Sequence, residues 1–122
     1  MKDMLLIVFS VLLAALGQLL LKLGMMRVGR ISSIARAPFM ILTALSSPIV
    51  LAGLAVFGIS ALSWLVVLSR VRLSIAYPMV SLGYVVTVFF AWLIYNEPVK
   101  PAVTILGCLM IILGVFFISR GL

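Results

Sequence analysis

The chain has 122 residues, of which 66% are hydrophobic and only 9% are charged. This composition cannot supply the charged surface of a soluble domain, so the solvent of the folded chain is lipid. The formal net charge of +7 would suggest nucleic acid binding in a soluble protein. Here the Lys and Arg residues cluster at the ends of apolar runs, where they act as topology and headgroup signals. A lone Cys108 and the absence of His exclude disulfide and zinc chemistry, and we expect no metal, cofactor or catalytic residue.

Four apolar stretches are long enough to cross the roughly 30 Å of a bilayer core, which takes about 20 residues each. The first predicted helix covers about residues 4–26. It resembles a signal peptide after Lys2, but it stays apolar as far as Leu21 and lacks a convincing small-residue cleavage site, so we expect it to be retained. Gln18 and Lys22 lie one turn apart on the same face of this helix.

A basic link follows, in which residues 33–45 could form an interfacial helix with an apolar side made of Ile34, Ile41, Leu42 and Leu45. The second membrane helix is predicted over about residues 48–69. It begins at Ser46-Ser47-Pro48, because a Ser side chain can cap free backbone N–H groups and Pro suits the first turn.

The third predicted helix, about residues 73–95, is separated from the second by only Arg70, Val71 and Arg72. So tight a turn makes the two helices antiparallel neighbours. Asn96-Glu97-Pro98 ends the third helix, and Pro101 starts the fourth, about residues 101–119. The sequence therefore predicts an all-α integral membrane protein, a single four-helix transmembrane domain over residues 1–122.

Membrane orientation is normally set by an excess of Lys and Arg on one side. One predicted side carries Lys2, Arg70, Arg72 and Arg120, and the other carries Arg27, Arg30, Arg36 and Lys100. Four against four gives no preference, so either the chain inserts both ways and pairs antiparallel with itself, or a partner chain decides its orientation. Alternatively, Asp3, Glu97 and unequal loop lengths break the tie.

Polar groups inside the bilayer are costly, so those that face a bundle interior are candidates for function. Lys22 leads these candidates, although its long side chain could simply reach the interface. Gln18 is the second, although it could instead bond between helices. A pump for hydrophobic cations needs a buried carboxylate, and the first, second and fourth helices have none. An embedded Lys with nearby Arg residues and hydroxyls instead complements a phosphate or another anion.

The third helix has the clearest polar face. Pro78 has no N–H to donate to the carbonyl of Ser74, so it breaks the hydrogen-bond ladder beside that face. Such a wall suits a sugar or phosphate, and the alternative is ordinary hydroxyl packing between helices. The side chains of this face recur every three or four residues: Ser74, Tyr77, Ser81 and Tyr84, with Thr87 close to the same side.

Three further features bear on function. Gly107 and Gly114 are two turns apart on the fourth helix, where a second helix can approach closely, which predicts a dimer interface. Glu97 most often would cap the fourth helix or pair with a loop cation, and otherwise belongs to the substrate site. Trp64 and Trp92 are interface belts or pocket walls.

These residues resemble those of the small four-helix members of the drug/metabolite transporter superfamily, the EamA-like and small multidrug resistance-like proteins. The resemblance covers nearly the whole chain. It rests on Gly17-Gln18-Leu19-Leu20-Leu21-Lys22, the segment from Trp64 through Ser74-Ile75-Ala76-Tyr77-Pro78-Met79-Val80-Ser81-Leu82, Asn96-Glu97-Pro98-Val99, and the Gly107 and Gly114 pair. The small multidrug exporters have a Glu two turns before the Lys, where this chain has Ala14. The chain is more similar to the subunits that flip aminoarabinose-phosphoundecaprenol across the bacterial inner membrane.

This resemblance implies a multi-pass inner-membrane flippase subunit for a lipid-linked sugar phosphate, acting as a homodimer or with a related four-helix subunit. The implied groove is lined by Lys22, Gln18, Tyr77 and Ser81, while the polyprenyl tail stays in lipid. No acidic residue specifically calls for the amine of aminoarabinose. Two alternatives are a small-molecule exporter of the small multidrug resistance type, with Glu97 as its coupling group, and a structural or regulatory membrane subunit.

Overall fold

The computed structural model describes residues 2–120 of the chain, and over this range it contains six helices and no strand. They are α1 (Lys2–Val28), α2 (Ala37–Leu45), α3 (Pro48–Arg70), α4 (Leu73–Met79), α5 (Ser81–Tyr95) and α6 (Pro101–Ser119). Four segments of this range are long and apolar enough to cross a membrane: α1, α3, the combined α4 and α5, and α6. The predicted all-α, four-span architecture is thereby confirmed.

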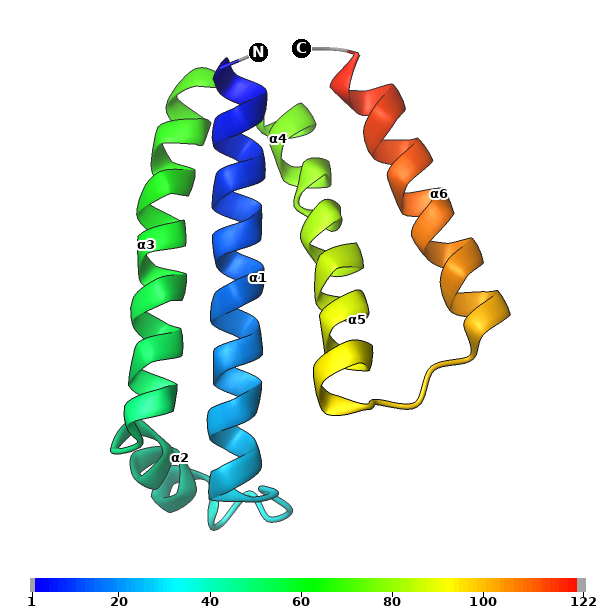
Figure 1. The fold of residues 1–122 in the computed structure, drawn as a ribbon. Helices are drawn as coiled ribbons and strands as arrows, with labels where there is room; N and C mark the ends of the chain where they lie inside the picture. The colour runs from blue at the N-terminus through cyan, green and yellow to red at the C-terminus, as the bar shows by residue number, and fades with distance from the viewer. Residues whose placement is uncertain (1, 121–122) are drawn as a thin grey trace.

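The spans run alternately up and down, so that α1 begins and α6 ends at the same end of the bundle (Figure 1). α1 lies between α3 on one side and α4–α5 on the other, and α6 is outermost (Figure 1). The prediction that the second and third spans are neighbours is therefore wrong: α3 meets α4 only around the short link between them, because α1 occupies the space beside α3.

Glycines explain why α1 pairs so closely with α3. A methyl group built on Gly53 would lie 2.9 Å from the backbone nitrogen of Leu21, and one on Gly17 would lie 3.0 Å from that of Phe57. Only hydrogen fits at these positions, and such small residues let membrane helices approach backbone to backbone. The sequence pattern predicts a helix contact only at the glycine pair of the last helix, and not at Gly17 or Gly53.

The third predicted span is interrupted at Val80, which separates α4 from α5. Pro78 cannot donate a backbone hydrogen bond and its ring crowds the preceding turn. The chain responds with tighter bonds: Val80 N–H donates to the Tyr77 carbonyl at 3.0 Å, and Gly83 N–H donates to the Val80 carbonyl at 2.9 Å. The interruption expected at Pro78 is therefore a local tightening of the helix at Val80, whose backbone keeps right-handed helical dihedral angles.

Several predicted boundaries shift by a few residues. α1 extends two residues further at each end than predicted, and the helix expected over residues 33–45 begins only at Ala37, after a turn at residues 34–36 that contains the exposed Ile34. α3 does begin at Pro48, but Ser47 makes no side-chain cap bond there. The Ser46 hydroxyl instead donates to the Thr43 carbonyl at 2.6 Å, so it closes α2 rather than opening α3.

The buried apolar core lies at the end of the bundle where α1 begins and α6 ends (Figure 1). There the first half of α1 meets the end of α3, α4 and the last half of α6. The other end is more open, because the first half of α6 diverges from α5 (Figure 1). We call the buried residues of this core the apolar cluster. Its members are Ile7, Val11, Val67, Val71, Ile75, Ala76, Met79 and Val115.

Candidate functional site: a polar groove beside an ion pair

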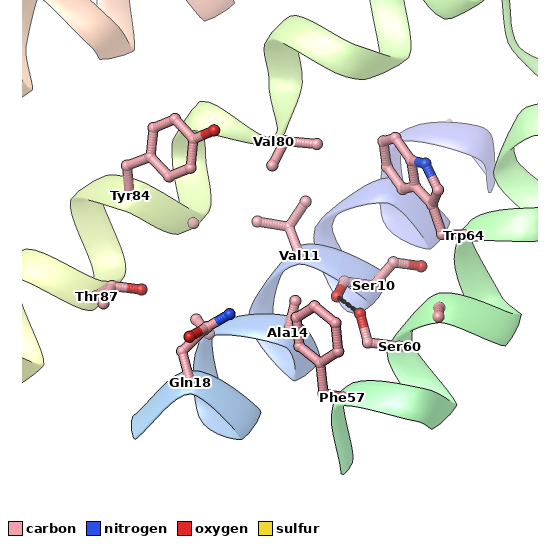
Figure 2. A pocket seen from close by; sticks show the side chains of 13 residues that line it. Ser10, Val11, Ala14, Gln18, Phe57, Ser60, Trp64, Val80, Tyr84 and Thr87 are labelled. Atoms are coloured by element: carbon pink, nitrogen blue, oxygen red, sulfur yellow. Dashed lines mark hydrogen bonds between the residues drawn. The ribbon is translucent and has the colours of Figure 1, made fainter. Parts of the chain in front are cut away.

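A groove runs over α1, with α3 and α5 as its walls (Figure 2). Its volume is about 340 Å³. α1 supplies the floor, and aromatic side chains of α3 and α5 stand on either side (Figure 2). The residues labelled in Figure 2 line it: Ser10, Val11, Ala14 and Gln18 from α1; Phe57, Ser60 and Trp64 from α3; Val80, at the break, and Tyr84 and Thr87 from α5.

Two serines mark the polar part of the groove. The Ser60 hydroxyl donates to the backbone carbonyl of Ser10 over 2.8 Å and so joins α3 to α1 (Figure 2). The hydroxyl of Ser10 is buried and has no hydrogen-bond partner among the described residues. A buried hydroxyl without a partner is costly, so Ser10 leaves an unsatisfied polar group beside the groove. Gln18 and Thr87 add further donors and acceptors.

The groove contains three of the predicted site residues: Gln18, Trp64 and Tyr84. Trp64 is therefore a pocket wall. Ser74 and Tyr77 are exposed and do not line the groove, and the Ser81 hydroxyl donates to the Pro78 carbonyl at 2.7 Å. The structure thus divides the predicted hydroxyl face. Tyr84 and Thr87, one or more turns into α5, reach the groove, whereas Ser74 and Tyr77 of α4 and Ser81 at the start of α5 do not.

The sequence analysis did not select Ser60 or Phe57. The only signal for Ser60 is a hydroxyl within an apolar span, and Ser63 on the same helix carries that signal too. Ser63 donates to the Ile59 carbonyl of its own helix at 3.1 Å. Sequence alone could not separate these two serines, because the difference depends on which face of α3 meets α1.

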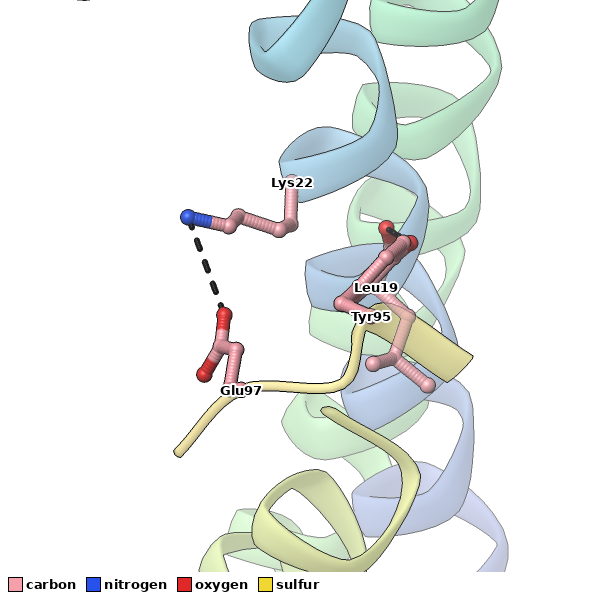
Figure 3. A network of polar contacts seen from close by, with 4 residues as sticks. All are labelled: Leu19, Lys22, Tyr95 and Glu97. Atoms are coloured by element: carbon pink, nitrogen blue, oxygen red, sulfur yellow. Dashed lines mark hydrogen bonds and ion pairs between the residues drawn. The ribbon is translucent and has the colours of Figure 1, made fainter. Parts of the chain in front are cut away.

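Lys22 and Glu97 form an ion pair just beyond the groove (Figure 3). Lys22 Nζ lies 3.7 Å from Glu97 Oε1, and both side chains are about half exposed. The prediction that Glu97 caps the last helix or pairs with a loop cation is corrected: its partner is a helical Lys of α1, and the residue at the start of α6 is Lys100, without a side-chain cap bond.

Tyr95 makes a second connection at the same end. Its hydroxyl donates to the backbone carbonyl of Leu19 at 2.5 Å and so joins the end of α5 to α1 (Figure 3). The next residue, Asn96, adopts the left-handed conformation with φ 52° and ψ 35°, which Asn tolerates better than most residues. This turn ends α5 and directs Glu97 toward α1.

A second, apolar cavity of about 400 Å³ lies between α5 and the first half of α6. Trp92 and Cys108 line it. Gly107 and Gly114 lie on α6, and a methyl group built on either would meet nothing within 4 Å. The predicted glycine pair thus faces away from the other described helices.

Comparison with known proteins gives the family. The chain is 38% identical over 80 residues to a protein of Pseudomonas savastanoi pv. phaseolicola named "Probable 4-amino-4-deoxy-L-arabinose-phosphoundecaprenol flippase subunit ArnE", and the match covers 66% of this chain and 69% of that protein. This chain belongs to the ArnE family. Its match to the Pseudomonas aeruginosa ArnE is 35% identical over 77 residues, covering 63% of this chain and 66% of the relative.

A third ArnE relative, from Pseudomonas syringae pv. syringae, is 39% identical over 67 residues, which cover 55% of this chain and 61% of that protein. The matched part is therefore about two thirds of each ArnE protein or slightly less. No protein-family model matches the chain, and no solved structure matches it significantly.

Proposed function

We propose that this chain is a subunit of a flippase that moves an undecaprenyl phosphate-linked amino sugar across the bacterial inner membrane, in which it is a multi-pass protein. It acts as a transporter and not as an enzyme. The observation that carries the proposal is the 38% identity to an ArnE protein. Four membrane-spanning segments support it, as does a mainly apolar groove with a few polar side chains between them.

The groove offers a crossing headgroup some of the hydrogen bonds that water makes with it outside the membrane. The main barrier to moving a sugar through hydrocarbon is the loss of its hydrogen bonds. The Ser10 hydroxyl, Gln18 and Thr87 can replace those bonds, and Trp64 and Tyr84 provide flat surfaces for the sugar ring. A volume of about 340 Å³ lies at the small end of the range for ligand pockets, roughly 300–1,000 Å³, which suits one sugar unit.

Lys22 is the group proposed to hold the phosphate. It lies one turn from Gln18, or about 6 Å along the helix axis, so a phosphate at Lys22 leaves the attached sugar within reach of the groove. The polyprenyl tail needs no protein cavity, because it is as apolar as the lipid around it.

The dimer predicted from the sequence is also a proposal. The relatives are named as flippase subunits, which supports action together with a second subunit. We propose that the partner, a second copy or a related four-helix chain, packs on the face of α6 that carries Gly107 and Gly114. Both glycines leave that face flat enough for close helix contact.

Native mass spectrometry of the purified protein tests the proposal, with 4-amino-4-deoxy-L-arabinose-phosphoundecaprenol and the lipophilic cation tetraphenylphosphonium as probes. The lipid should bind, and Gln18→Leu should weaken its binding about tenfold, which corresponds to about 1.4 kcal/mol. Ser63→Ala is the matched control, since its hydroxyl bonds its own helix. Binding of the cation without the lipid would favour the small-molecule exporter, and binding of neither would favour a structural subunit.

A further inference from the structure

The Lys22–Glu97 pair is an open ion pair. At 3.7 Å its two atoms are farther apart than the roughly 2.7–2.9 Å of a charged hydrogen bond. Half exposure lets a ligand reach both members. Each group therefore keeps most of its bonding capacity, and a third molecule with matching charges can insert between them (Figure 3).

Glu97 is well placed to be the single acidic contact at this end of the molecule. The chain has only two acidic residues, and the other, Asp3, lies 3.9 Å from Arg70 at the opposite end of α1. Besides Lys22, the Glu97 end carries four cations, on the last turn of α1, on the α1–α2 link and just before α6: Arg27, Arg30, Arg36 and Lys100. A positively charged group that arrives here meets repulsion everywhere except at Glu97.

The substrate under the proposed function carries both charges. Its phosphodiester is an anion, and an aliphatic amine is protonated at neutral pH. We infer that this headgroup, as it arrives and before its sugar enters the groove, exchanges partners with the Lys22–Glu97 pair, its phosphate binding Lys22 and its ammonium binding Glu97, so that Glu97 is the residue that selects amino sugars. This inference rests on the proposed function, and it supplies the acidic contact for the amine that the sequence analysis had not found.

Exchange leaves every charge with a partner, which explains the selectivity. When the zwitterionic headgroup binds, one ion pair becomes two and no charge is left alone. A lipid-linked sugar with a hydroxyl in place of the amine would take Lys22 from Glu97 and leave the carboxylate without a counterion beside the membrane. An ionised group that loses its partner carries a cost, which the half exposure of Glu97 keeps modest.

The backbone on either side of Glu97 is constrained. Asn96 turns the chain in the left-handed conformation, and Pro98 restricts the backbone of the residue before it. The Tyr95 hydroxyl holds the end of α5 against the Leu19 carbonyl. Glu97 is thus presented to Lys22 by a constrained turn, which is the preorganisation that selective binding needs.

Two lipids that differ only at one atom test the inference: 4-amino-4-deoxy-L-arabinose-phosphoundecaprenol and L-arabinose-phosphoundecaprenol. We expect the wild-type protein in nanodiscs to prefer the amino lipid by about tenfold, as one charge-assisted hydrogen bond allows. Glu97→Gln should bind both lipids and reduce the preference to near one. Asp3→Asn, which removes the other acid, should keep it.

The outcomes separate the inference from the proposed function. If the wild type binds both lipids equally, or if Glu97→Gln keeps the full preference, Glu97 does not select the amine, although the flippase reading stands. The wild-type comparison requires no variant, so equal binding of the two lipids would overturn the inference even if Glu97→Gln fails to fold. If the wild type binds neither lipid, the proposed function fails and the role of the pair fails with it.

Discussion

The hydroxyl of Ser60 joins α3 to α1 through one buried bond of 2.8 Å to the Ser10 carbonyl. Ser60→Ala removes it, and we expect the free energy of unfolding to fall by about 0.6 kcal/mol, the average for bonds between membrane helices, and by no more than about 1.7 kcal/mol. Unfolding in mixed micelles with increasing sodium dodecyl sulfate would measure this.

Ser63→Ala is the control for that experiment, because the Ser63 hydroxyl bonds a carbonyl of its own helix. Its effect should stay within about 0.5 kcal/mol. Equal losses in the two variants would show that the bond between the helices contributes nothing beyond side-chain packing.

At the scale of single residues, sequence reasoning found polar groups but not their partners. Gln18 and Lys22 are one turn apart on one helix, a relation that spacing alone establishes. The partner of Lys22 is Glu97, which comes from a distant part of the chain and reaches α1 only because of the turn at Asn96. Contacts of this kind depend on how the helices are arranged, which local pattern does not contain.

Among the elements, the close pairing of α1 and α3 depends on glycines, and α3 offers a matched test of it. Gly53→Ala would place a methyl group 2.9 Å from the Leu21 backbone nitrogen, whereas Gly58 has nothing within 4 Å of its added carbon. We expect Gly53→Ala to lower stability by about 1–3 kcal/mol through overpacking. Gly58→Ala should be neutral or stabilising, since Ala favours the helix.

Thermal unfolding in detergent, followed by circular dichroism, would compare the two variants. The reverse order of stabilities, or no difference between them, would contradict the proposed role of Gly53 in the α1–α3 contact.

Helix ends were predictable where a local signal marks them. α3 begins at Pro48 and α6 at Pro101, as predicted, because Pro suits the first turn whatever surrounds it. Pro78 predicted a weakened ladder, but not that the helix would stop at Met79 and restart at Ser81. A membrane helix can bend or break at Pro according to what its neighbours accept, and those neighbours were unknown.

For the whole molecule, the number of spans and their alternation across the membrane followed from hydropathy. The prediction was wrong about the helix that packs beside α3, which is α1. A short link forces two helices to be antiparallel, but it leaves a third free to pack between them. α1 does so because of the glycine contacts with α3. The four-against-four distribution of cations over the two ends agrees with the ends of the spans in the structure.

A substitution on α6 tests whether the subunits associate through this helix. Gly107→Leu adds bulk to a face that no other described helix covers, so the folded subunit should be unaffected while dimers weaken at least tenfold, or about 1.4 kcal/mol. Native mass spectrometry across a dilution series would measure the dimer fraction. Gly58→Leu, at an equally open position on α3, is the control, and an unchanged dimer fraction in Gly107→Leu would place the interface elsewhere.

The apolar cluster holds the spans together at one end, and α6 extends away from it toward the other end of the bundle. Its 19 residues make a rod about 28 Å long at about 1.5 Å per residue. α6 meets the cluster at Val115, about 21 Å from Pro101 at about 1.5 Å per residue. A rotation of about 10° there, within the roughly 15–20° scatter of ordinary helix crossings, would move the far tip of α6 by about 4 Å. The width of the gap between α5 and α6 is therefore set by an angle at the opposite side of the membrane.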